Sequence, residues 1–241
     1  MHNLFSNSQA LDLINRMELW SQLLRRHQEE VIIEAVNLSK EWLEEVRLRF
    51  IGDRLLADVL QEKSWSEEDL NIHLSRQEAL LRFSRQRFGP GLEDRFLAAR
   101  GRRDEVIYSL LRVRDPGLAR ELWIRLEEGE TTFAEAAHQH SEGPEAQMRG
   151  IIGPTEIGLL QPEKLQDILR SLRPGELCAP KVLGEWHVLL RLEQLTPARF
   201  DDAMKTRMLE EALNEFLQAR VISLLAGEAD ILEPIHYDPE S

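Results

Sequence analysis

The sequence predicts an α+β protein in which a small sheet-containing domain is preceded and followed by helices. Three observations lead to this prediction. The first hundred or so residues repeat apolar side chains at three- and four-residue steps, the spacing of a buried helix face. After residue 104, short β-branched runs alternate with short helical segments. From Phe200 to Leu225 the helical spacing returns in one long segment.

Residues 1–104 are expected to form a helical domain. One apolar stripe runs from Leu11 to Leu24, and a second runs from Val31 to Phe50. A further helix should begin at Ser64–Asp69, because a serine N-cap followed by acidic residues suits the positive end of a helix dipole. The glycine–proline–glycine sequence at 89–91 should end it.

Residues 105–194 are expected to form the sheet-containing domain. The run at 106–113 is apolar and β-branched, as in a strand, and the proline at position 116 suits the first turn of a helix. The remaining expected elements are a helix at 133–140, an irregular stretch with one strand at 143–158, a helix from 162, and strands at 177–183 and 186–192. The order β-α-α-β-α-β-β predicts an α+β domain with a small sheet.

The last part of the chain is expected to contain one amphipathic helix within residues 195–227. Its apolar positions run from Met204 to Val221. Residues 228–241 are acidic and are expected to form a loosely held tail.

Composition excludes several classes of function. The net charge of −13 argues against binding nucleic acid by phosphate neutralisation. No apolar run approaches the ~20 residues that span a bilayer, so no membrane insertion is expected. The N-terminus shows no signal-peptide pattern, and the single cysteine, Cys178, cannot form an intrachain disulfide. No metal or cofactor is expected, because His138 and His140 fit a solvated helix end and no Cys/His set has zinc-ligand spacing. The sequence therefore predicts a cytoplasmic protein.

Four segments of the sheet-containing domain carry a resemblance to a known family. They are Leu126–Ala137, Arg149–Gly153, Leu172–Leu177 and Gly184–Leu189, and they follow one another in the family's order over about ninety residues. The domain resembles the parvulin-type peptidyl-prolyl isomerases. The flanking helices resemble those of multidomain foldases in which a parvulin module is inserted into a helical chaperone domain. This resemblance implies that the C-terminal helix packs back onto residues 1–104.

The resemblance also implies which residues form the site. His187 matches the family's second catalytic histidine, and Ser109 stands where the first would be. The positions implied to bind substrate are Ile151, which replaces a Cys or Asp, the pocket residues Leu160 and Leu165, and Trp186 beside the histidine.

Rotation about an X–Pro bond has a barrier of about 18–20 kcal/mol, and an isomerase must favour the twisted amide with polar groups aimed at it. Isoleucine can neither ionise nor donate a hydrogen bond. Weak or absent isomerase activity is therefore expected, with binding of polypeptide retained.

Three functions are compatible with this pattern. The first is a parvulin-family foldase or chaperone that binds unfolded or proline-containing polypeptide in an apolar cradle, with a second, shallower site on the parvulin module. The second is an active isomerase that uses His187 and Ser109. The third is an adaptor that presents one secreted or maturing peptide to a secretion or peptide-maturation machinery.

Overall fold

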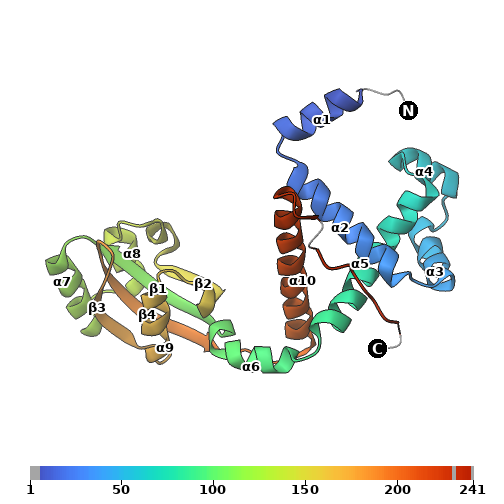
Figure 1. Ribbon diagram of the computed structural model, residues 1–241. Coiled ribbons are helices and arrows are strands. Elements are labelled where there is room, and N and C mark those ends of the chain that lie inside the picture. The colour runs from blue at the N-terminus through green and yellow to red at the C-terminus, as the bar shows by residue number, and fades with distance from the viewer. Residues whose placement is uncertain (1–5, 230–231, 240–241) are drawn as a thin grey trace. The chain divides into compact units, whose positions relative to one another are not determined.

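The computed structural model describes residues 6–229 and 232–239, which form two compact units (Figure 1). One unit contains the chain up to Leu92 together with the chain from Asp201 onward, and the other is Glu93–Phe200. The boundaries expected at residues 104 and 194 therefore differ from those of the structure. The difference arises because most of helix α6 (Leu92–Arg103) belongs with the sheet-containing unit.

Two hydrogen bonds hold the flanking segments to the sheet-containing unit. The Arg170 guanidinium donates to the carbonyl of Gly101 at 3.4 Å. The Asp104 carboxylate accepts a hydrogen bond from the backbone N–H of Ala198 at 2.8 Å. Segments on both sides of the expected domain thus belong to its folded structure.

The first unit is helical. Its helices are α1 (Asn7–Arg16), α2 (Trp20–Val36), α3 (Lys40–Ile51), α4 (Leu56–Lys63), α5 (Glu67–Phe88) and α10 (Asp202–Leu225). Helix α10 lies alongside α2 and α5 (Figure 1). The core between these three helices consists of Ile32, Ile33, Val36, Ala79, Phe83, Leu213 and Leu217.

The N-terminal helices are more divided than their apolar stripes indicate. The stripe that runs to Leu24 is interrupted between α1 and α2, where Glu18 has a positive φ of 57°. The stripe from Val31 to Phe50 is interrupted at Asn37, which has a left-handed backbone, and Ser39 caps the next helix. Helix α4 was not expected. Among the described residues, no helix is long and apolar enough to cross a bilayer.

The tail expected to be loose is in part packed. Within the described residues 232–239, Ile235 and Tyr237 lie against the helical core, because the isoleucine side chain and the tyrosine ring both offer apolar surface. Residues 230–231 and 240–241 of that expected tail lie outside the described residues.

The second unit is built on a four-stranded antiparallel sheet in the order β2-β1-β4-β3 (Figure 1). Its elements are β1 (Glu105–Val113), α7 (Pro116–Glu127), α8 (Phe133–His140), the short helix η1 (Pro144–Met148), β2 (Ile151–Glu156), the short helix η2 (Ile157–Leu159), α9 (Glu163–Ser171), β3 (Leu177–Leu183) and β4 (Trp186–Thr196). The predicted α+β class is confirmed.

The sheet has a separate core on each face, because side chains alternate along a strand. On one face, here called the α9 face, Tyr108 and Leu110 pack with residues of α9. On the other, the α7–α8 face, Leu111 and Val113 pack with residues of α7 and α8 such as Phe133. The position of any strand residue therefore decides which set of helices it faces.

Candidate functional site

The six residues expected to form the site do not come together. Residues opposite each other on neighbouring strands share a face of the sheet. The α7–α8 face carries Ser109, Ile151 and His187. The α9 face carries Leu160, Leu165 and Trp186. The single pocket implied by the resemblance is therefore not formed by these residues.

Ser109 and His187 are also separated along the sheet. Ser109 lies opposite Arg191, whereas His187 lies opposite Val113, four positions further along β1. At ~3.3 Å per residue this is about 13 Å along the strand. The serine hydroxyl and the imidazole cannot act on one amide from these positions.

The Ser109 hydroxyl already has a partner. Ser109 is 1% exposed, and its hydroxyl donates to the Glu193 carboxylate. The same carboxylate accepts a hydrogen bond from Arg191 Nε at 2.8 Å. Ser109 therefore belongs to a partly buried polar cluster that holds β1 to β4.

The surroundings of His187 are apolar. Its neighbours on the two flanking strands are Val113 and Val182. Within the described residues no hydrogen bond or ion pair of the His187 ring is found, and the side chain is half-buried. The residues that would orient a catalytic imidazole are thus missing from its immediate neighbourhood.

The expected substrate-binding residues occupy three different environments. Ile151 begins the edge strand β2 and is 50% exposed. Leu160 and Leu165 are buried in the core of the α9 face. Trp186 is half-buried and packs against the rim of the same core. Only Ile151 and Trp186 are accessible to a ligand, and they lie on opposite faces.

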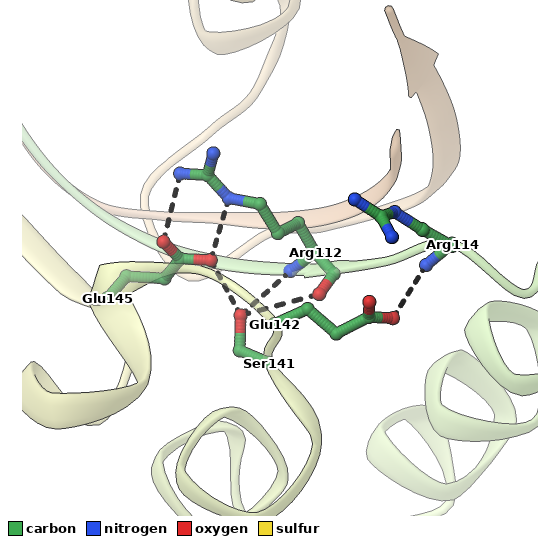
Figure 2. Close-up of polar contacts among 5 residues, drawn as sticks. All are labelled: Arg112, Arg114, Ser141, Glu142 and Glu145. Carbon is green, nitrogen blue, oxygen red and sulfur yellow. Dashed lines mark hydrogen bonds and ion pairs between the residues drawn. The ribbon is translucent and has the colours of Figure 1, made fainter. Parts of the chain in front are cut away.

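The structure instead places a polar cluster at the end of β1, which the sequence did not reveal (Figure 2). Arg112 Nε and Nη2 each donate to the Glu145 carboxylate at 2.9 Å. The Ser141 hydroxyl donates to the same carboxylate at 2.6 Å. The Glu145 side chain is only 2% exposed and that of Arg112 is 29% exposed. This bidentate ion pair is the charged centre of the α8–β2 connection.

Backbone contacts extend this cluster into a short ladder along β1. The Glu142 N–H donates to the carbonyl of Arg112 at 2.9 Å, and the Leu110 N–H donates to the carbonyl of Gly150 at 2.8 Å. The Glu142 carboxylate accepts from the backbone N–H of Arg114 at 2.9 Å (Figure 2). The segment between α8 and β2 is therefore held against the edge of β1.

Gly143 allows the close approach within this cluster. A Cβ at position 143 would collide with the Glu145 carboxylate and would lie 2.5 Å from Arg112 Nε. A glycine directly after Ser141-Glu142 was the one sequence signal for the cluster. It was not sufficient, because nothing in the sequence pairs position 112 with position 145.

An arginine–tryptophan surface lies next to the cluster. The Arg114 guanidinium is 4.8 Å from the centroid of the Trp186 ring, and that of Arg112 is 5.9 Å from it. Arg114 also lies 3.8 Å from the Glu185 carboxylate. Cation–π contacts of this kind suit the recognition of a ligand rather than acid–base chemistry, because an arginine does not exchange its proton near neutral pH.

A cavity of about 560 Å³ opens on the other side of the sheet-containing unit. Its walls are the α7–α8 loop, the first turn of α8 and the start of β3, and they include Phe133, Leu177 and Arg191. The Arg191 guanidinium is 5.4 Å from the centroid of the Phe133 ring. The cavity thus combines apolar side chains with two threonines, the Glu127 carboxylate and the Arg191 guanidinium, a combination that suits binding rather than proton transfer.

Cys178 is expected to be unreactive in the folded protein. Its thiol is buried, and burial raises its pKa, so the thiolate fraction at any given pH is lower than in an unfolded chain. Iodoacetamide labelling at pH 8 should be at least ten-fold slower for the folded chain than for the chain in urea. Equal labelling rates in the two states would contradict the buried position.

One family match covers most of the sheet-containing unit. Residues 117–194 match the Rotamase family, described as the PPIC-type PPIASE domain. None of the curated proteins matches the chain.

Several solved structures are similar to the chain. The peptidylprolyl isomerase PrsA from Bacillus anthracis is 18% identical, with 90% of this chain and 99% of that chain covered and a TM-score of 0.45. PrsA from Bacillus cereus is 17% identical, with 95% and 90% covered and a TM-score of 0.48. A Campylobacter jejuni structure described under PEB4 and Cj1289, two SurA-like chaperones, is 12% identical, with 97% and 96% covered and a TM-score of 0.38.

These three TM-scores lie below 0.5, so the assignment rests on the family match and on the element order of the sheet-containing unit. That order is the β-α-α-β-α-β-β order which the sequence predicts. The chain therefore carries a parvulin-type, PpiC-class peptidyl-prolyl isomerase domain in its sheet-containing unit.

Proposed function

We propose that this protein is a parvulin-family foldase or chaperone that binds unfolded or proline-containing polypeptide and has little or no isomerase activity. The observation that carries this proposal is the separation of Ser109 from His187. His187, on β4, lies opposite Val113, four positions along β1 from Ser109, and the Ser109 hydroxyl is bound to Glu193. A rotamase scaffold whose polar residues lie too far apart to act together can still bind polypeptide on its surface. It lacks the groups that would stabilise a twisted amide.

Two accessible features of the domain support binding of polypeptide. The cavity beside Phe133 and Arg191 has room for apolar side chains. The arginine–tryptophan surface at Arg114 and Trp186 offers a flat aromatic face and a cation. Neither feature includes a group that exchanges a proton near neutral pH, so both fit a binding role better than a chemical one.

The proposal predicts that the full chain suppresses the aggregation of an unfolded protein, and that His187→Ala does not change this. Light scattering of chemically denatured citrate synthase, diluted into buffer with an equimolar amount of the chain, should fall by about half or more. The His187→Ala variant should match the wild type, because the imidazole has apolar neighbours on both flanking strands.

Two outcomes would contradict the proposal. One is the absence of any suppression by the wild-type chain at a several-fold molar excess. The other is a loss of suppression in His187→Ala while circular dichroism shows a folded protein, since the histidine would then belong to the client site. Purification of the chain with one defined peptide and no other client would favour the adaptor function instead.

A further inference from the structure

Residues 232–239, here called the tail segment, lie on the helical unit in the manner of a bound peptide. The segment forms neither helix nor strand, and from Ile235 to Asp238 its side chains alternate between half-buried and exposed. Ile235 and Tyr237 pack against the helical core, whereas His236 between them is exposed. Alternation with a period of two is the pattern of an extended chain laid on a surface.

The helical unit holds the tail segment through its backbone. The side-chain amide of Gln86, on α5, donates to the carbonyl of Asp238 and accepts from its N–H at 3.0 Å. This two-point contact copies what a neighbouring strand offers to a peptide. On α10, Arg220 Nη1 donates to the carbonyl of Glu233 at 2.8 Å. Backbone contacts of this kind do not depend on the side chains of the bound segment.

The surface beneath the tail segment has an aromatic ring in contact with two cations. The guanidinium groups of Arg87 and Arg220 lie 4.9 Å and 5.5 Å from the centroid of the Phe216 ring. Arg87 also lies 3.8 Å from the Glu233 carboxylate, and Arg220 Nε donates to the Gln28 amide oxygen at 2.6 Å. The surface therefore complements a segment that carries both apolar and acidic side chains.

The tail segment does not fill this surface. A cavity of about 260 Å³ lies between α10 and Leu232–Pro234, and another of about 420 Å³ lies beside Gln86 and Tyr237. The two apolar anchors, Ile235 and Tyr237, are only half-buried, whereas the core residues beneath them are almost inaccessible. A segment that served only to complete the core would be buried more fully.

We propose that the surface formed by Gln86, Arg87, Phe216 and Arg220 is a polypeptide-binding groove, which the tail segment occupies as an internal competitor. The groove takes an extended segment with apolar side chains at positions i and i+2 and a carboxylate nearby. This inference rests on the proposed function for the claim that the ligand is client polypeptide. The geometry of the groove does not depend on that claim.

Tethering sets how strongly the tail segment competes. Residues 226–231 join α10 to the tail segment, and a covalent connection of this length gives an effective concentration in the millimolar range. A free peptide that makes the same contacts displaces the tail segment only when its own concentration approaches this effective concentration. Releasing the tail segment should therefore tighten the binding of an added peptide by ten-fold or more.

The test uses a fluorescein-labelled synthetic peptide with the sequence of residues 232–239 and the full chain. Fluorescence anisotropy should show binding at least ten-fold tighter to the double variant Ile235→Ser/Tyr237→Ser than to the wild type. The matched control His236→Ser, which changes the exposed residue between the anchors, should bind like the wild type. Adding Gln86→Ala to the double variant should remove most of the gain, because the backbone contacts are lost.

A second measurement covers the case in which the double variant does not fold. Hydrogen–deuterium exchange of the wild-type chain with excess unlabelled peptide should show faster exchange within residues 232–239, by about five-fold. Equal peptide binding by all variants, or hydrogen exchange in the tail segment that the peptide does not change, would contradict the proposed binding groove. If the chain suppresses the aggregation of citrate synthase but does not bind the peptide, the proposed groove is contradicted and the proposed function is not.

Discussion

Replacing Glu145 by alanine should destabilise the sheet-containing unit by about 3 kcal/mol, because it leaves the Arg112 guanidinium without its counter-charge. The Glu145 side chain is 2% exposed and accepts three hydrogen bonds, two from Arg112 and one from Ser141. Its loss also frees the segment that these bonds hold against β1. Urea unfolding, followed by tryptophan fluorescence, measures the change.

The control for this prediction is the neighbouring residue Glu142. Glu142 is exposed, and its carboxylate accepts one backbone hydrogen bond, from Arg114. Glu142→Ala should therefore cost about 1 kcal/mol or less. The double variant Arg112→Met/Glu145→Leu should regain much of the stability lost in Glu145→Ala, since no charge is then left without its partner. Equal losses for Glu142→Ala and Glu145→Ala would contradict the central role of the ion pair.

Replacing Gly153 by alanine should cost about 3 kcal/mol, because the position combines a positive φ with a close backbone contact. Gly153 has a φ of 117°, and a Cβ there would lie 2.5 Å from the carbonyl oxygen of Val106. Strand β2 would have to move away from β1 to make room. The free energy of unfolding, measured in urea, reports this loss.

Gly129 provides the matched comparison. It also has a positive φ, of 71°, but a Cβ there would meet nothing within 4 Å. Gly129→Ala should therefore cost only about 1 kcal/mol, the conformational part of the penalty. If the two alanine variants were equally stable, the contact between Gly153 and Val106 would not limit the packing of β2.

The elements that the sequence predicts best are those with local signals at their ends. Ser66 and Asp69 form the capping box that opens α5, and Asp115 caps α7 next to a proline. Helix α4 has no side-chain hydrogen bond at its N-cap, Leu55, so the sequence carries no capping signal at the start of this helix. The break at Asn37 is hidden for another reason: the apolar spacing continues on both sides of it.

The candidate site is less predictable, because the distance between residues on neighbouring strands depends on how the strands pair. Ser109 lies opposite Arg191 and His187 lies opposite Val113, so the two side chains share a face but lie four positions apart along the sheet. The positions of Ser109 and His187 in the sequence do not reveal this. Nor do they reveal that Arg112 pairs with Glu145, since a long-range ion pair leaves no periodic pattern.

We propose that this parvulin-type domain binds polypeptide, although its two expected catalytic residues lie too far apart to act together. The most direct test is a protease-coupled assay of cis–trans exchange in a series of proline tetrapeptides, run with the full chain. The chain is expected not to accelerate isomerisation above the uncatalysed rate, because Ser109 is bound to Glu193 and lies far from His187. Clear acceleration that disappears in His187→Ala would contradict it.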